Sequence, residues 1–225
     1  MQARGYKWFL LVAGGVTGPV SFTLVYLVLG AVQAAYDPWR RPVSDLSAGS
    51  LGAIQVASFI ICGVSIIGFA LAFRRSPTPA GGRSTPLLLS IVGAALLLAG
   101  IFITDPAPGY PAGNHSPTTT LHGVIHLVAS VLVFTSLPVA CFVMARRYAQ
   151  SRLPMWAAYS IASGILMWAF LFAFGLSNVK GGPAGLFERM AITTGWTWIS
   201  LQALRLLRSR VAASWAYELE RVANR

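Results

Sequence analysis

The side chains best suited to chemistry lie in one short stretch, residues 105–126, which reads DPAPGYPAGNHSPTTTLHGVIH. It contains all three histidines of the chain, His115, His122 and His126. His122 and His126 are four residues apart, so on a helix they share one face at a separation of about 6 Å. Zinc sites use this spacing and take a further ligand from elsewhere. The stretch is therefore a candidate zinc site with these three histidines as ligands. The alternative is a pair of interfacial histidines hydrogen-bonded to neighbouring helices.

Three carboxylates are candidate catalytic groups beside these histidines: Asp45, Asp105 and Glu188. Asp105 ends an apolar run and precedes Pro106, which cannot continue a helix. A carboxylate at a helix C-terminus meets the negative end of the dipole, so Asp105 needs a partner, and a histidine or a metal would serve. A capping or turn role before the proline is the alternative. Asp45 either caps the next helix or acts as a ligand or base. Glu188 either complements the dipole of the helix that it opens or acts as an acid–base group.

Three arginines are candidate substrate-binding groups: Arg40, Arg41 and Arg189. Arginine pairs with phosphate through two parallel hydrogen bonds, so Arg40 and Arg41 are suited to a phosphate or lipid headgroup. The alternative is that they pair with nearby aspartates. A contact from Arg189 to Asp45 or Asp105 would close the site.

The composition of the chain indicates the kind of element that must position these side chains. The 225 residues are 56% hydrophobic and only 10% charged, with a mean hydropathy of +0.66, whereas soluble domains carry about 25% charged residues. A bilayer core of about 30 Å takes roughly 20 helical residues. Six apolar stretches have suitable lengths, so we expect an all-α transmembrane bundle of six helices with short loops over residues 1–207. The stretches are 9–35, 52–73, 87–104, 121–145, 155–179 and 190–207.

The distribution of basic residues predicts the orientation of the bundle in the cell membrane. Only four of the 17 Lys and Arg residues lie on one side of the predicted helices, namely Arg40, Arg41, Lys180 and Arg189. The positive-inside rule therefore places both termini in the cytoplasm and the loops 36–51, 105–120 and 180–189 outside. Residues 208–225 are expected to form an amphipathic helix on the cytoplasmic leaflet. The net charge of +11 comes from short blocks between apolar runs, a pattern typical of membrane topology rather than of nucleic-acid binding.

Four short motifs resemble the DUF998 family of predicted bacterial and archaeal membrane proteins. They are Ser44-Asp45-Leu46, Asp105-Pro106, His122-Gly123-Val124-Ile125-His126 and Gly185-Leu186-Phe187-Glu188-Arg189. The resemblance covers nearly the whole chain. It implies a six-helix membrane fold with a recurring polar set of Asp45, Asp105, His122, His126, Glu188 and Arg189. It implies no particular activity.

These observations predict an integral membrane protein with a polar cluster at its extracytoplasmic face. Three functions are compatible with the cluster. A zinc-dependent hydrolase would act there on a lipid or a lipid-linked molecule. A non-enzymatic structural or lipid-binding protein would use the cluster as a polar lid. A small transporter is the third hypothesis, although the sequence shows few polar residues at mid-membrane and no pair of broken helices.

Overall fold

A computed structural model describes the backbone of residues 2–76, 82–114 and 119–223, and the side chains that these ranges contain between residues 8 and 209. Six α-helices and one 3₁₀ helix account for most of it, and the described ranges contain no β-strand. The all-α prediction is therefore confirmed. The helices are α1 (Gln2–Val32), η1 (Val43–Ala48), α2 (Gly52–Arg74), α3 (Ser84–Ile101), α4 (Leu121–Gln150), α5 (Pro154–Lys180) and α6 (Ala184–Ala223).

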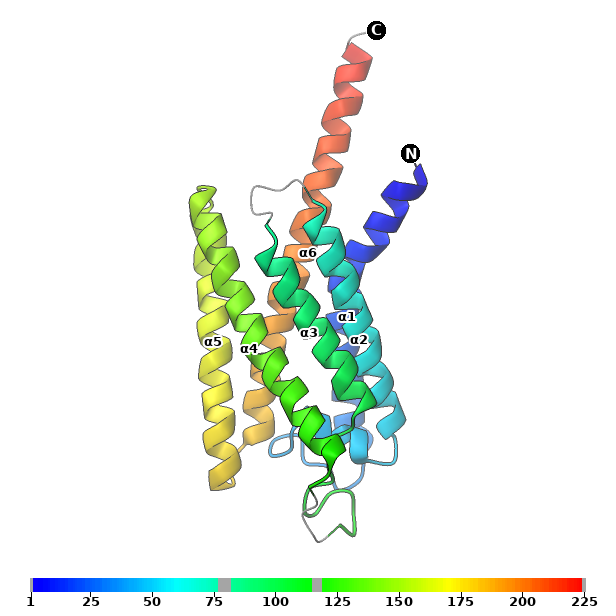
Figure 1. Cartoon of the computed structure of the whole chain (residues 1–225), viewed down its shortest axis with the longest axis vertical. Coiled ribbons are helices and arrows are strands. Elements are labelled where there is room, and N and C mark those ends of the chain that lie inside the picture. Colours follow the sequence, from blue (N-terminus) through cyan, green and yellow to red (C-terminus); the bar gives the residue numbers. More distant parts are fainter. Residues whose placement is uncertain (1, 77–81, 115–118, 224–225) are drawn as a thin grey trace.

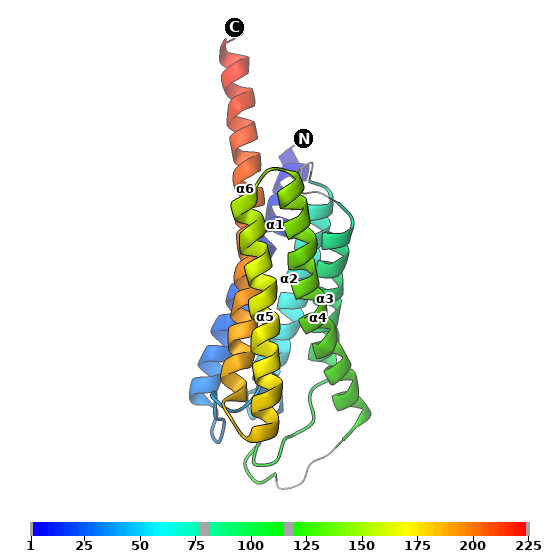
Figure 2. The same cartoon turned by 90° about the vertical axis from the view of Figure 1, so that its left-hand side faces the viewer.

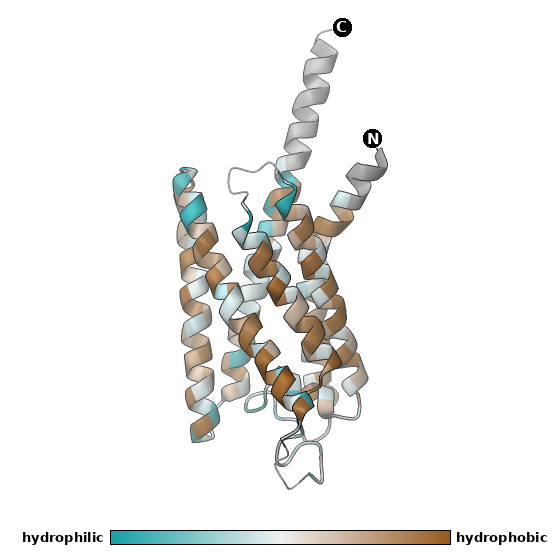
Figure 3. Cartoon of the chain, in the orientation of Figure 1, coloured by the Kyte–Doolittle hydropathy of each residue, from teal (hydrophilic) through white to brown (hydrophobic). Residues whose placement is uncertain are grey.

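Five of these helices are long and apolar enough to cross a membrane, which indicates a multi-pass membrane protein. They are α1 from Trp8 onward, α2, α3, α4 and α5. Most residues along these helices are hydrophobic, and the most hydrophilic ones gather toward the helix ends (Figure 3). The described part of α6 is not among the five, so a sixth crossing stays a prediction.

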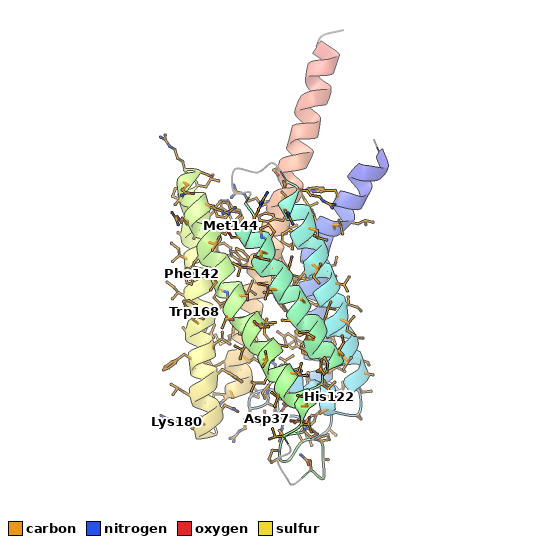
Figure 4. The ribbon with its side chains drawn as sticks, in the orientation of Figure 1. Asp37, His122, Phe142, Met144, Trp168 and Lys180 are labelled. Carbon is orange, nitrogen blue, oxygen red and sulfur yellow. The ribbon has the colours of Figure 1, made fainter. Side chains whose placement is uncertain are left out.

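The α-helices pack in a ring that follows the order of the chain. Each helix contacts the next one, and α6 closes the ring by packing against α1 (Figures 1 and 2). Both termini lie at one end of the bundle, which we call the terminal end. The opposite end, called the distal end below, carries the segments 33–51, 102–114, 119–120 and 181–183. Asp37, His122 and Lys180 all lie there (Figure 4).

Small residues bring α1 close to α2. A Cβ atom added at Gly14 would lie 3.0 Å from the Ser65 backbone oxygen, and one added at Gly18 would lie 2.7 Å from the Ser65 Cβ. Glycines spaced four apart remove side chains from one helix face and so let two membrane helices approach.

Several element boundaries differ from the sequence prediction. The first helix ends at Val32, not at residue 35, and α6 begins at Ala184, not at residue 190. The third helix ends at Ile101, not at residue 104, because Phe102 has an extended backbone. Residues 208–223 do not form a separate tail helix: α6 runs to Ala223 without a break, and this segment contains no glycine or proline to end it. The loop 36–51 contains η1, whose residues Val43 and Leu46 are buried one turn apart.

Polar and aromatic side chains, most of them buried, join α4, α5 and α6 toward the terminal end of the bundle. The Trp198 indole donates to Ser160 Oγ at 3.0 Å, and the Tyr148 hydroxyl donates to Gln202 Oε1. The Arg205 guanidinium lies 4.7 Å from the ring centres of Tyr148 and of Trp156, where cation–π attraction stabilises it. We call these six residues the inner plug.

Candidate functional site

The distal end is held together by Arg189, near the start of α6. Its Nη1 donates to the backbone oxygens of Pro38 at 2.6 Å, Arg41 at 3.1 Å and Gly185 at 2.9 Å, and its Nη2 donates to the Tyr36 hydroxyl at 2.5 Å. Gly185 permits this contact, because a Cβ there would lie 2.3 Å from the Arg41 oxygen. Arg189 thus binds segment 36–42 through carbonyl groups and forms no ion pair with Asp45 or Glu188.

Glu188, the residue before Arg189, is buried against η1. Its Oε2 accepts a hydrogen bond of 2.6 Å from the backbone N–H of Val43, and only 6% of the residue is exposed. Burial raises the pKa of Glu188 to about 7, and the Val43 hydrogen bond and the Arg189 charge oppose this rise. Glu188 therefore holds a proton that is exchangeable near neutral pH, the property that an acid–base group needs.

Asp45 lies in η1 and pairs with Arg41. The distance from Arg41 Nη1 to Asp45 Oδ2 is 3.5 Å. Arg41 also donates to the Pro108 oxygen at 2.9 Å and lies 5.3 Å from the centre of the Tyr110 ring. Burial raises the pKa of Asp45 to about 6, although Arg41 lowers it in part. Arg41 thus joins η1 to the segment 102–114.

His126, on α4, completes the end of α3. Its Nδ1 lies 3.1 Å from the oxygen of Ala99 and 2.8 Å from that of Phe102. Both are carbonyls of the last turn of α3, which lack a partner within the helix. Because carbonyls only accept, Nδ1 carries the hydrogen. A second N–H on this buried ring would be a charged donor without a partner, so Nε2 holds a lone pair.

The Nε2 atom of His126 is buried and has no hydrogen-bond partner in the described structure, and the same is true of Trp196 Nε1. Both residues line a central cavity of about 40 Å³, to which all six α-helices and η1 contribute. A cavity needs roughly 10–15 Å³ to hold one water molecule. The cavity is therefore large enough for a small polar group. Glu188 and Ser130 also line it.

A groove of about 530 Å³ opens from this region between α4 and α5. The two helices diverge toward the distal end in both views of the bundle (Figures 1 and 2). Apolar residues form the walls, with Leu127 and Val131 on α4 and Trp168, Leu171 and Phe172 on α5. Most of the polar residues are at the end near η1. They are Ser44, Asp45, Thr104, His126, Ser130 and Glu188, and all but Asp45 and Thr104 also line the central cavity. Thr135 lies further along α4, and its hydroxyl donates to the Val131 oxygen of its own helix at 2.7 Å.

The remaining candidate residues lie away from this polar set. Asp105 accepts hydrogen bonds from the Thr120 N–H at 2.8 Å and from the Thr120 hydroxyl at 2.6 Å, which lower the Asp105 pKa. Asp105 thus stabilises the start of α4, whose N-terminal dipole favours a negative charge. The exposed ring of His122 packs against Phe102, with ring centres 5.2 Å apart. Arg40 is exposed and pairs with Asp37 at 3.7 Å.

No group of three His, Cys, Asp or Glu residues suited to a metal occurs in the described ranges. The Nδ1 of His126 is engaged by α3, and His115 lies outside the described residues. Zinc binding by His115, His122 and His126 therefore stays a prediction.

Several residues of the site were not among the sequence candidates. The Tyr36 hydroxyl donates to the oxygens of Arg41 at 3.2 Å and Pro42 at 2.9 Å, and burial raises its pKa. The Tyr110 hydroxyl donates to Gln33 Oε1, which inserts segment 102–114 into the bundle. Trp196 lies within an apolar run, where nothing in the sequence marks it as part of a site. Tyr36 and Tyr110 could have been found, because a tyrosine in a loop carries a hydroxyl group that is usually hydrogen-bonded when the ring is buried.

Comparisons with known proteins identify one family. The family described as "Protein of unknown function (DUF998)" matches residues 16–205. No curated protein and no solved structure matches the chain. The four motifs that resemble this family all contribute to the distal end: one forms part of η1, one follows α3, and the other two begin α4 and α6. Because the match spans most of the sequence, the chain belongs to the DUF998 family.

Proposed function

We propose that this protein binds an amphiphile taken from the bilayer. The chain of the amphiphile occupies the groove between α4 and α5, and its polar end reaches Asp45, Glu188 and His126. We further propose that α6 forms a sixth crossing and that the distal end is extracytoplasmic, so that the ligand comes from the outer leaflet of the cell membrane.

The single observation that carries this proposal is the polarity of the groove along its length. Its walls are apolar and include side chains that are largely exposed: Val131 is 52% exposed and Phe172 is 70% exposed. Its inner end carries carboxyl, imidazole and hydroxyl groups. Ligand sites usually combine apolar walls with a few convergent polar groups. A bilayer molecule with one chain and one polar end has the same distribution of polarity.

The proposed function is tested by placing a larger side chain in the wall of the groove and measuring whether long-chain probes still bind there. Val131→Trp adds bulk to its wall, whereas Val128→Trp makes the same change on the same helix outside it. The two valines have similar exposures of 52% and 55%. The probes are photoreactive long-chain molecules that share one chain and differ in their polar end: an alcohol, a methyl ether, a phosphate, an amine and a carboxylic acid.

At least one probe is expected to crosslink to the α4 and α5 peptides of the groove in the purified wild type. Val131→Trp should reduce this crosslinking at least fivefold, and Val128→Trp should leave it unchanged. Equal labelling of both variants with every probe would refute the proposal, because the chain would then lie on the general lipid-facing surface.

A further inference from the structure

Two residues that line the central cavity carry one unused acceptor and one unused donor. The acceptor is His126 Nε2, whose lone pair follows from the donation of Nδ1–H to the end of α3. The donor is the indole N–H of Trp196. The two residues are 3% and 5% exposed. A buried polar atom without a partner costs about 1–3 kcal/mol. Such a pair, on two residues that line the same cavity, is therefore suited to a ligand that satisfies both atoms.

We infer that the amphiphile is a neutral long-chain alcohol whose hydroxyl group enters the central cavity, donates to His126 Nε2 and accepts from the Trp196 N–H. A hydroxyl is the smallest organic group that both donates and accepts. The inference rests on the proposed function, since the chain of this alcohol occupies the groove between α4 and α5.

Charged polar ends fit the same place less well. A phosphate or a carboxylate would approach Asp45 and Glu188, and the nearby guanidinium groups are already engaged. Arg41 binds Asp45 and the Pro108 oxygen, and Arg189 binds backbone oxygens. Asp45 and Glu188 would attract an ammonium group, but such a group only donates, so it would leave the Trp196 N–H without an acceptor. A buried charge that lacks complementary partners is strongly disfavoured.

The methyl ether probe tests the two proposed hydrogen bonds independently of each other. It accepts from Trp196 but gives nothing to His126 Nε2. His126→Asn retains an N–H donor close to the position of Nδ1 and removes Nε2, so α3 keeps a capping partner. Trp196→Phe keeps an aromatic ring and removes the donor.

Competition against the crosslinked probe measures the affinity of each polar end. The alcohol is expected to compete at least tenfold better than the methyl ether, the phosphate, the amine or the carboxylic acid. His126→Asn should weaken the alcohol about tenfold, the loss of roughly one buried hydrogen bond, and should leave the ether unchanged. Trp196→Phe should weaken both. A general loss of packing would instead weaken all five competitors alike.

Wild-type protein with ¹⁵N-labelled histidine gives a readout that needs no variant. The ¹⁵N chemical shift of the unprotonated Nε2 of His126 should change when the alcohol is added and should not change with the ether.

Two outcomes distinguish a failure of the proposed function from a failure of the hydroxyl inference. If no probe is sensitive to Val131→Trp, the proposed function fails. If the chain binds in the groove but the alcohol and the ether compete equally, or the His126 signal does not change, the proposed function stands and the hydroxyl inference is overturned.

Discussion

At the scale of single residues, Glu188 and Asp45 make the distal end sensitive to pH. The folded pKa of Glu188 is about 7 and that of Asp45 about 6, both above the ordinary values of 4.5 and 3.8. The folded state therefore holds more protons than the unfolded state between these limits. The contribution of these two groups to the free energy of unfolding is largest below about pH 4. It decreases as the pH rises and is lost once the pH has passed their folded pKa values of about 6 and about 7.

We predict that Glu188→Gln reduces this pH dependence. One pKa unit corresponds to about 1.4 kcal/mol, so Glu188 accounts for a loss on the order of 3 kcal/mol between pH 4.5 and 8. Thermal unfolding in detergent, followed by tryptophan fluorescence, measures the change. The wild-type Tm should fall over this range and the variant Tm should fall less, with Asp45 responsible for the remainder. If the Tm of the two proteins changed with pH in the same way, Glu188 would not be a buried carboxyl group with a raised pKa.

At the scale of elements, the start of α6 is fitted to the backbone of segment 36–42. A Cβ on Gly185 would lie 2.3 Å from the Arg41 oxygen and 2.7 Å from the Pro38 oxygen. Both atoms belong to the backbone that Arg189 binds, so neither can move without disturbing those hydrogen bonds.

We predict that Gly185→Ala lowers stability by about 1–3 kcal/mol, because overpacking forces the backbone to shift. The matched control is Gly175→Ala on α5, where an added Cβ meets nothing within 4 Å. That variant should be neutral or up to about 1 kcal/mol more stable, since alanine favours helix. Both are measured by thermal unfolding, with limited proteolysis of segment 36–51 as a local readout. Equal Tm values for the two variants would contradict the close packing.

Apolar runs located every α-helix of this protein, and the predicted first residues of α2 and α4 match the observed ones. The partners of the polar residues were harder to predict. Sequence spacing gives the height of a side chain along its helix, but the rotation of that helix depends on all its neighbours. Charge-based reasoning paired Arg189 with a carboxylate, whereas Arg189 binds carbonyl groups that every residue possesses and no sequence pattern marks. For Asp105 it expected a histidine or a metal as the partner, with a capping or turn role as the alternative, and Asp105 interacts with Thr120 at the start of α4.

At the scale of the whole molecule, the common end of the two termini requires an even number of crossings (Figure 1). We predict that single cysteines at Asp37 and Lys180 react with a membrane-impermeant maleimide in intact cells, and that cysteines at Arg75 and Arg152 do not. The native Cys62 and Cys141 are free and buried. The experiment therefore starts from a variant in which serine replaces both, so that only the introduced cysteine can react. Labelling at Arg75 or Arg152 from outside would reverse the proposed orientation.

The inner plug bears on the routes open to a bound molecule. It joins α4, α5 and α6 on the terminal side of the cavity, through the Trp198–Ser160 and Tyr148–Gln202 hydrogen bonds and the aromatic rings around Arg205. An amphiphile that enters from the lipid, as we propose, therefore meets buried side chains of these three helices on its terminal side. This arrangement favours our proposal of a binding protein over that of a transporter.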